Sequence, residues 1–283
     1  DDVFWGKRVV RELILNEPSN MPLKYPRQVS YDNHLSLGNT YTGDEVFAGV
    51  DSRKNLITIL MEAAITRQVN VYNSNLSRQY SFEEIKGSHA EGIEANEGEE
   101  LVEGLFNFTF AKNFIEEGDE EDEWGADDDE EIVTRDVLMN FDASYVARYV
   151  IVEDWFFDKR RSKMDSRIIS ITPVFEYTVK ELDEDGFAED KDRTKSGATF
   201  FYPEIRELLT NHKIYNAQNM MARMSFDEFF QRRLFSSYIL KESNVADFAI
   251  SDYISEADKL SQLLEGERMK ENIRTFEHNA WEY

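Results

Sequence analysis

The sequence predicts an α+β fold that mixes helices with short antiparallel strands. Two strand-like blocks around a basic turn predict a β-hairpin near the middle of the chain, and apolar residues at helical spacing predict several helices. The chain has 283 residues and is 41% hydrophobic, which suffices for a core in one large domain or two modest ones. We therefore expect a globular protein.

The central hairpin is the most distinctive feature of the sequence. Its predicted strands are Tyr149–Phe157 and Arg167–Thr178, and the first of them is unusually aromatic. Successive side chains of a strand point to opposite faces of the sheet. We therefore expect Trp155 and Phe157 to enter the core and Phe156 to lie on the opposite face.

Helical spacing and capping residues predict the remaining elements. Helices are expected at 4–15, at 51–65 with Asp51 or Ser52 as cap, at 203–211 with Pro203 in the first position, at Phe226–Phe235 behind a Ser225 and Glu228 capping box, and after Ser255 and Asp258. The last helix would bury Leu260, Leu263, Leu264, Ile273 and Phe276 on one face, with Gly266 as a candidate break. Strands are expected at 69–73 and 198–202, and residues 182–196 are expected to form a polar loop.

An internal repeat suggests how these elements are grouped. A helix, a Tyr-Asn strand and a Ser-Phe-acid-Glu cap recur in the two halves, at 52–66, 70–73 and 81–85 and again at 203–211, 213–216 and 225–229. Chance agreement of capping motifs is the alternative explanation. The repeat predicts two similar lobes joined by the hairpin, with an N-terminal lobe at 1–90, a largely solvated acidic insertion at 91–131 and a C-terminal lobe at 132–283.

The charge is unevenly distributed along the chain. With 57 acidic and 32 basic residues the net charge is -25, and residues 91–131 alone hold 18 acidic residues and one basic residue, Lys112. Within this insertion the alternation of Phe106, Phe108 and Phe110 predicts one short strand. An acidic chain of this kind is poorly suited to bind nucleic acid, since binding a polyanion depends on Lys and Arg. The absence of cysteine excludes disulfides and thiolate zinc sites.

The usual signatures of enzymes and cofactor sites are missing, so we predict no catalytic, cofactor-binding or metal-binding residues. The four histidines, His34, His89, His212 and His278, are far apart in the sequence. A Gly-x-Ser-x-Gly elbow and a phosphate-binding glycine loop are both absent. Two alternatives stay open: a carbohydrate-active hydrolase that uses Glu153, Asp154 and Asp158, and a calcium-binding loop at 181–192 that departs from the usual ligand pattern.

Charged and aromatic residues predict a protein interface instead. Charge complementarity orients docking partners, and arginine and aromatic residues are enriched in interfaces. A solvated turn and a structural role are the alternatives for these residues. The candidates are Asp154, Phe156 and Asp158 on the first strand, Lys159, Arg160, Arg161 and Lys163 at the hairpin tip, and Arg232, Arg233 and Phe235 further along the chain.

Several separated blocks of the sequence resemble the GldN/PorN family, which comprises periplasmic components of the type IX secretion and gliding motility machinery of the Bacteroidetes. These blocks are Met21-Pro-Leu-Lys-Tyr-Pro26, the hairpin from Tyr149 to Pro173, the helix that begins at Tyr202-Pro203, the segment Ser225 to Asn244, and Phe276-Glu-His-Asn-Ala-Trp281. The order and spread of the blocks make the resemblance stronger than any one of them would.

The resemblance implies a non-enzymatic scaffold protein. It implies a periplasmic subunit that assembles with a GldK/PorK-like lipoprotein into a ring at the inner face of the outer membrane and contacts a GldL/GldM-like motor complex. No run of 18 or more apolar residues is present, so membrane association would come through the partner, and an export signal would have been removed before residue 1.

Overall fold

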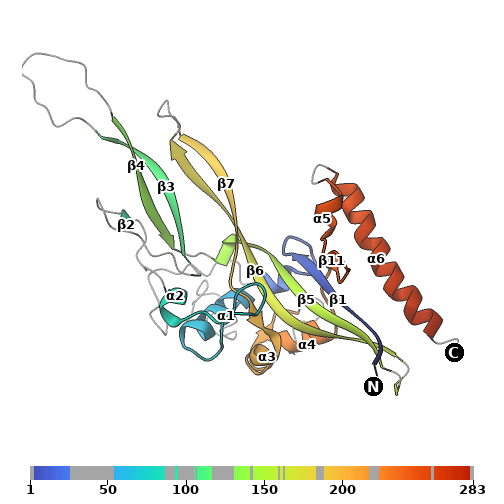
Figure 1. Ribbon diagram of the computed structural model, residues 1–283. Coiled ribbons are helices and arrows are strands. Elements are labelled where there is room, and N and C mark those ends of the chain that lie inside the picture. The colour runs from blue at the N-terminus through green and yellow to red at the C-terminus, as the bar shows by residue number, and fades with distance from the viewer. Residues whose placement is uncertain are drawn as a thin grey trace, which may run out of the picture.

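The fold is α+β, as predicted, with helices packed around a long, curved antiparallel sheet (Figure 1). The computed structural model describes residues 3–25, 54–86, 93–94, 105, 107–116, 131–140, 143–158, 160–161, 163–182, 188–216, 223–255 and 258–280. Every structural statement below concerns these residues.

The main sheet joins strands from the beginning, the middle and the end of the chain. In spatial order it contains β11 (Tyr238–Glu242), β1 (Val3–Ile14), β5 (Val146–Asp158), β6 (Lys163–Leu182) and β7 (Ala188–Ser196), with β8 (Phe200–Phe201) also paired to β6. All of these pairs are antiparallel. The predicted central hairpin is confirmed as β5 and β6, and both strands are longer than predicted.

Two segments of the main sheet were predicted wrongly. Residues 4–15 form β1 and not a helix, because Val9, Arg11 and Leu13 alternate with less buried neighbours and fill one face of the sheet. Residues 188–196, predicted as part of a loop, form β7. The side chains of Lys191 to Thr194 are exposed, so the sequence of this strand carries no apolar alternation.

The helices follow the capping chemistry of the sequence, with shifts at their ends. They are α1 (Leu56–Ile65), α2 (Phe82–Lys86), α3 (Tyr202–Asn211), α4 (Phe226–Gln231), α5 (Ile250–Tyr253) and α6 (Lys259–Ala280), with 3-10 turns at Met21–Lys24 and Ala143–Tyr145. The side chain of Asn55 caps α1 by accepting a hydrogen bond from the Thr58 amide at 2.9 Å, whereas the predicted caps lie outside the described residues. Ser225 caps α4 as predicted, but α4 ends at Gln231.

The predicted insertion contains more regular structure than expected. A second sheet holds β2 (Ile93–Glu94), β3 (Asn107–Glu116) and β4 (Glu131–Asn140), and β3 and β4 form a ten-residue antiparallel ladder. The single predicted strand is therefore one half of a hairpin. The acidic tract at 117–130 and Phe106 lie outside the described residues.

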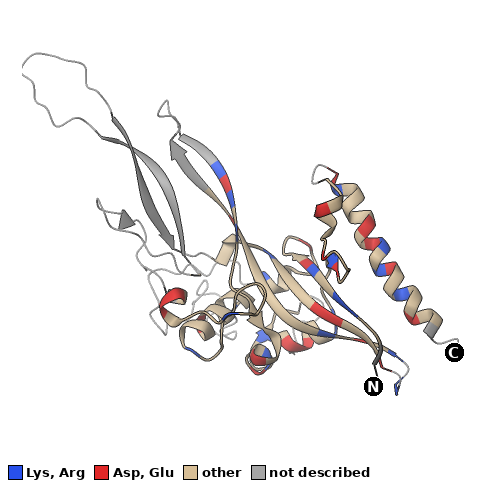
Figure 2. Cartoon of the chain, viewed as in Figure 1, with Lys and Arg blue, Asp and Glu red and all other residues tan. Residues whose placement is uncertain are grey.

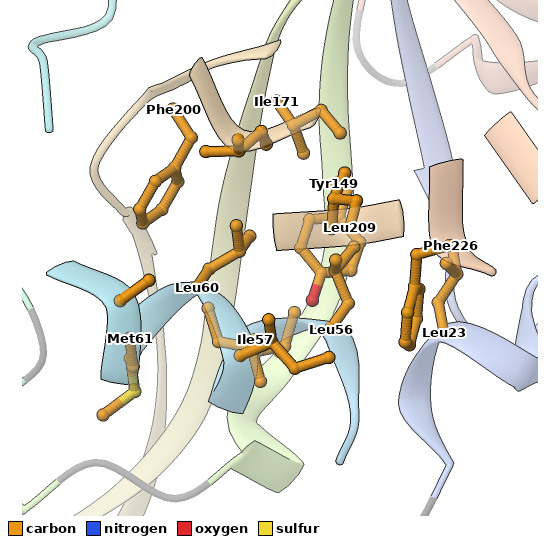
Figure 3. Close-up of a cluster of buried hydrophobic side chains, with 14 of the residues drawn as sticks. Leu23, Leu56, Ile57, Leu60, Met61, Tyr149, Ile171, Phe200, Leu209 and Phe226 are labelled. Atoms are coloured by element: carbon orange, nitrogen blue, oxygen red, sulfur yellow. The ribbon is translucent and has the colours of Figure 1, made fainter. Parts of the chain in front are cut away.

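The two halves of the predicted repeat contribute to one hydrophobic cluster. Figure 3 shows Leu56 and Leu60 of α1 close to Leu209 of α3, Tyr149 of β5 and Phe226 of α4. The second unit also contains a two-stranded sheet of β9 (Lys213–Ile214) and β10 (Met224–Ser225). The helices and the Ser81 and Ser225 caps thus recur in both units. The strand predicted at 69–73 is wrong, because Tyr72 makes only isolated bridges, with Gln79 and Thr199. The division into lobes stays a prediction.

The predicted apolar face of the last helix divides in the structure. Ile273 is buried and Phe276 stacks on Trp5 with ring centroids 4.8 Å apart. The leucines at 260, 263 and 264 are exposed instead. Gly266 does not interrupt α6: it is buried, and an added Cβ would lie 3.0 Å from the carbonyl oxygen of Ile239.

Candidate protein interface

The main sheet presents two different faces. On β5 the side chains of Tyr149, Ile151, Glu153 and Phe157 are buried, and those between them are half-buried. We call the first side the inner face. The second side, the outer face, comprises Arg8, Val10, Glu12 and Ile14 of β1 and Arg148, Val150, Val152, Asp154 and Phe156 of β5.

Ion pairs cross the outer face between β1 and β5. Arg8 binds Asp154 with both ends of its guanidinium, at 2.6 Å from Nε to Oδ1 and 2.8 Å from Nη2 to Oδ2. Arg148 lies 3.2 Å from Glu12 and 3.1 Å from Glu176. The hydrogen bond from Arg8 to Asp154 raises the pKa of Arg8, because it favours the charged guanidinium.

Apolar side chains lie between these two ion pairs. Val10 is opposite Val152, and Val150 is opposite Glu12, all of them half-buried. Arg167 of β6 lies over the ring of Phe156, with its guanidinium carbon 5.0 Å from the ring centroid. The outer face therefore combines an apolar centre with charged and aromatic margins, which is the composition of a protein contact surface.

Three predictions about β5 can be compared with this arrangement. Asp154 and Phe156 lie on the same face, as expected, and both are half-buried. Phe157 is buried in the core, also as expected. Trp155 also points to the inner face and packs against an apolar cluster there, as expected, but it is only partly buried.

The hairpin tip adjoins the outer face and carries its basic residues into solvent. Asp158 accepts hydrogen bonds from the amides of Arg160 at 2.8 Å and Arg161 at 3.3 Å, so its carboxylate holds the turn together. Arg160, Arg161 and Lys163 are exposed. Figure 2 shows basic positions at this end of the hairpin. Lys159 lies outside the described residues.

The third predicted group, Arg232, Arg233 and Phe235, does not form one surface. Arg232 is exposed and pairs with Glu228 at 2.6 Å. Phe235 is half-buried against Phe229 and Phe230. Arg233 turns into the molecule, where it binds Glu153. The structure therefore shows an internal role for Arg233, whereas a role of these three residues in binding a partner protein stays a prediction.

A buried charge centre on the inner face joins three distant parts of the chain. The carboxylate of Glu153 is fully buried and accepts hydrogen bonds from Arg11 Nε at 3.0 Å, Trp155 Nε1 at 2.9 Å, Arg233 Nη1 at 2.9 Å and Arg233 Nη2 at 3.1 Å. Arg233 Nη1 also donates to Ser166 at 3.0 Å. Burial lowers the pKa of Arg11 and outweighs the opposing attraction of Glu153.

The geometry around this centre depends on backbone and ring positions. Arg233 has a φ of 53°, a left-handed conformation that costs energy in a residue other than glycine. Its guanidinium carbon lies 4.9 Å from the centroid of Trp155, and that of Arg11 lies 5.4 Å away. The centre lies between two apolar clusters, one around α1, α3 and α4 and one beneath α6. We infer that it fixes these two clusters relative to each other.

The position of Glu153 argues against the alternative of a hydrolase. Glu153 is held by two guanidinium groups on the inner face, whereas Asp154 is paired with Arg8 on the outer face. A glycosidase needs two carboxylates that face the same glycosidic bond of the substrate. Asp158, the third candidate, is engaged in the turn.

The other predicted chemistry finds little support in the described part of the chain. The candidate calcium loop falls at the end of the β6–β7 hairpin, and its residues 183–187 are not among those described. Among the described residues no three His, Asp or Glu side chains are placed to share a metal ion. In the same part of the chain, no helix has the length and apolar character needed to cross a bilayer.

The fold and these surfaces define an α+β protein whose candidate site is a contact surface. A family model described as "Gliding motility associated protein GldN" matches residues 1–282, and the chain therefore belongs to the GldN family. The resemblance read from the sequence is confirmed, and the protein is gliding motility-associated. A comparison with curated proteins gives no match.

Proposed function

We propose that this protein is a non-enzymatic periplasmic scaffold subunit of the type IX secretion and gliding motility machinery. In this proposal it assembles with a GldK/PorK-like lipoprotein into a ring at the inner face of the outer membrane and contacts a GldL/GldM-like motor complex. Membership of the GldN family supports the proposal. In this proposal the protein functions by assembly and not by chemistry.

The observation that carries the proposal is the continuity of the outer face with the basic hairpin tip. Asp154 and Phe156 on the outer face lead along β5 to Arg160 and Arg161 at the tip. Surface ion pairs such as Arg8 with Asp154 contribute little to stability, whereas charge patterns strongly affect the rate and orientation of docking. The tip would set the orientation and the apolar centre of the outer face would supply the buried area.

The charge of the chain favours an acidic patch on the partner as the target of the tip. The chain carries a net charge of -25, so a concentrated basic turn is a local exception on its surface. Attraction between exposed charges decays within about 8 Å at physiological ionic strength. Docking through the tip should therefore weaken as salt is added.

The test is co-purification from membranes of the native organism, with size analysis of the complex. The variant Arg160→Glu with Arg161→Glu should lower recovery of the partner and leave thermal unfolding unchanged. A matched double reversal at Lys213 and Arg223, which are exposed elsewhere, should leave recovery unchanged. Equal recovery of the complex with both variants at all salt concentrations would refute docking through the tip, and recovery of only the free chain would refute assembly.

A further inference from the structure

Helix α6 carries a second, separate apolar surface on its outer side. Leu260, Leu263 and Leu264 are 67%, 41% and 61% exposed. At 100° per residue these three form one stripe, far around the helix from the face that packs Gly266, Met269 and Ile273 onto the molecule. We call Leu260, Leu263 and Leu264 the leucine stripe.

The leucine stripe is not explained by the fold. In Figure 1, α6 lies at the margin of the described chain, beyond β11, with its other side turned away from the sheet. Single exposed leucines are common, but three on adjacent turns form a contiguous patch, and such patches mark contact sites. The other exposed residues of α6 are polar or charged, with Lys259, Glu267 and Glu271 next to the stripe.

The charges around the stripe are arranged for self-association. Lys259 lies four residues before Leu263 and Glu267 lies four residues after it. If two copies of α6 pack antiparallel about Leu263, each Lys259 lies level with the Glu267 of the other copy. A two-fold axis makes this match occur twice. Within the described chain, Glu267 makes an exposed pair with Lys270 at 3.2 Å and also interacts electrostatically with Arg11.

The balanced charge of the helix also lets two such acidic chains meet there with little repulsion. Over Lys259–Ala280 the sequence has four basic and four acidic residues, whereas the whole chain carries -25. We propose that the leucine stripe is a homotypic contact, in which α6 packs antiparallel against α6 of a second copy of this protein with Leu263 at the centre. This inference does not depend on the outer face or on the hairpin tip.

The absence of cysteine from the chain allows a direct test of the geometry. We would make Leu263→Cys in the full chain, oxidise it mildly at high protein concentration, and measure the disulfide-linked dimer on a non-reducing gel. In the proposed pair the two thiols face each other across the axis. The control is Arg274→Cys, which is exposed and lies 11 residues away, so its two copies would be about 33 Å apart.

We expect the Leu263→Cys protein to form the disulfide-linked dimer and the Arg274→Cys protein to form none. Cross-linking of both would indicate a parallel pair, and cross-linking of neither would indicate that another molecule covers the stripe; either result would overturn the proposal. In the Leu263→Cys background, Lys259→Glu or Glu267→Lys alone should slow cross-linking about two- to fivefold, and the two together should restore it. Failure of the double variant to recover would refute the charge match.

Discussion

Glu153 and Asp154 are neighbours on one strand, and each binds an arginine of β1, yet their surroundings are opposite. Glu153 is fully buried with Arg11, and Asp154 is partly exposed with Arg8. Burial lowers the pKa of Arg11, while the hydrogen bond to Asp154 raises that of Arg8. The inner pair is thus a desolvated structural centre with a third partner, Arg233, and the outer pair is a hydrated surface feature.

The comparison teaches that two adjacent residues of one strand can have different roles, one in the stability of the fold and the other on a candidate contact surface. A broken buried pair leaves a charge without its partner in a medium of low dielectric constant, at a cost of about 3–5 kcal/mol. An exposed pair contributes about 0–1 kcal/mol. Substitutions on the two faces should therefore affect different measurements.

The largest effect is expected from Glu153→Gln. The amide keeps the shape of the side chain but leaves Arg11 and Arg233 without their counter-ion, so the free energy of unfolding in urea should fall by about 3–5 kcal/mol. The control is Asp154→Asn, one residue further on, which should change the free energy of unfolding by less than about 1 kcal/mol. Similar losses for both variants would remove the distinction between the faces.

A smaller effect is expected from Trp155→Phe. Phenylalanine retains the aromatic ring but cannot donate to Glu153 as Nε1 does at 2.9 Å, so we expect a loss of about 1–2 kcal/mol in unfolding free energy. Chemical unfolding monitored by circular dichroism would measure it. An unchanged midpoint would mean that the two arginines alone satisfy Glu153.

Phe156→Ala should separate stability from assembly on the outer face. Because the ring is half-buried under Arg167, we expect a loss of about 1 kcal/mol or less in stability. Binding to the membrane-derived complex should be reduced much more, as measured by co-purification. A folded variant that assembles normally would remove Phe156 from the proposed interface.

The smallest effect is expected from a double-mutant cycle on Arg8 and Asp154. Alanine at each position and at both should give a coupling free energy of about 0–1 kcal/mol in 0.15 M salt, falling further in 1 M salt. Urea titrations of the four proteins would measure it. A coupling above about 2 kcal/mol would show that the outer pair is as structural as the inner one.

The sequence predicted the parts of the fold that depend on local patterns. The β5–β6 hairpin follows from alternation around a turn, the start of α3 follows from Pro203 in its first turn, and the cap of α4 follows from Ser225. The common face of Asp154 and Phe156 also follows from the period of a strand.

The buried centre could not be predicted in this way. Arg11 and Glu153 are 142 residues apart, and Arg233 follows 80 residues after Glu153. No local pattern indicates that three such residues meet. The wrong prediction of a helix at 4–15 also left the position of Arg11 on the sheet unrecognised. A short segment with Val9, Val10 and Ile14 fits a helix and a strand almost equally. A charged residue within an otherwise apolar strand face was the one available signal.

Gly266 determines how the sheet can take part in a larger structure. Since glycine has no side chain, α6 approaches the backbone of Ile239 closely and occupies the space beside β11 where an additional strand would have to lie. An uncovered strand edge invites uncontrolled growth by backbone pairing with other chains. Because α6 covers that edge, contacts with other chains on this side must form through side chains, as the proposed scaffold would require if its assemblies are to stop at a defined size.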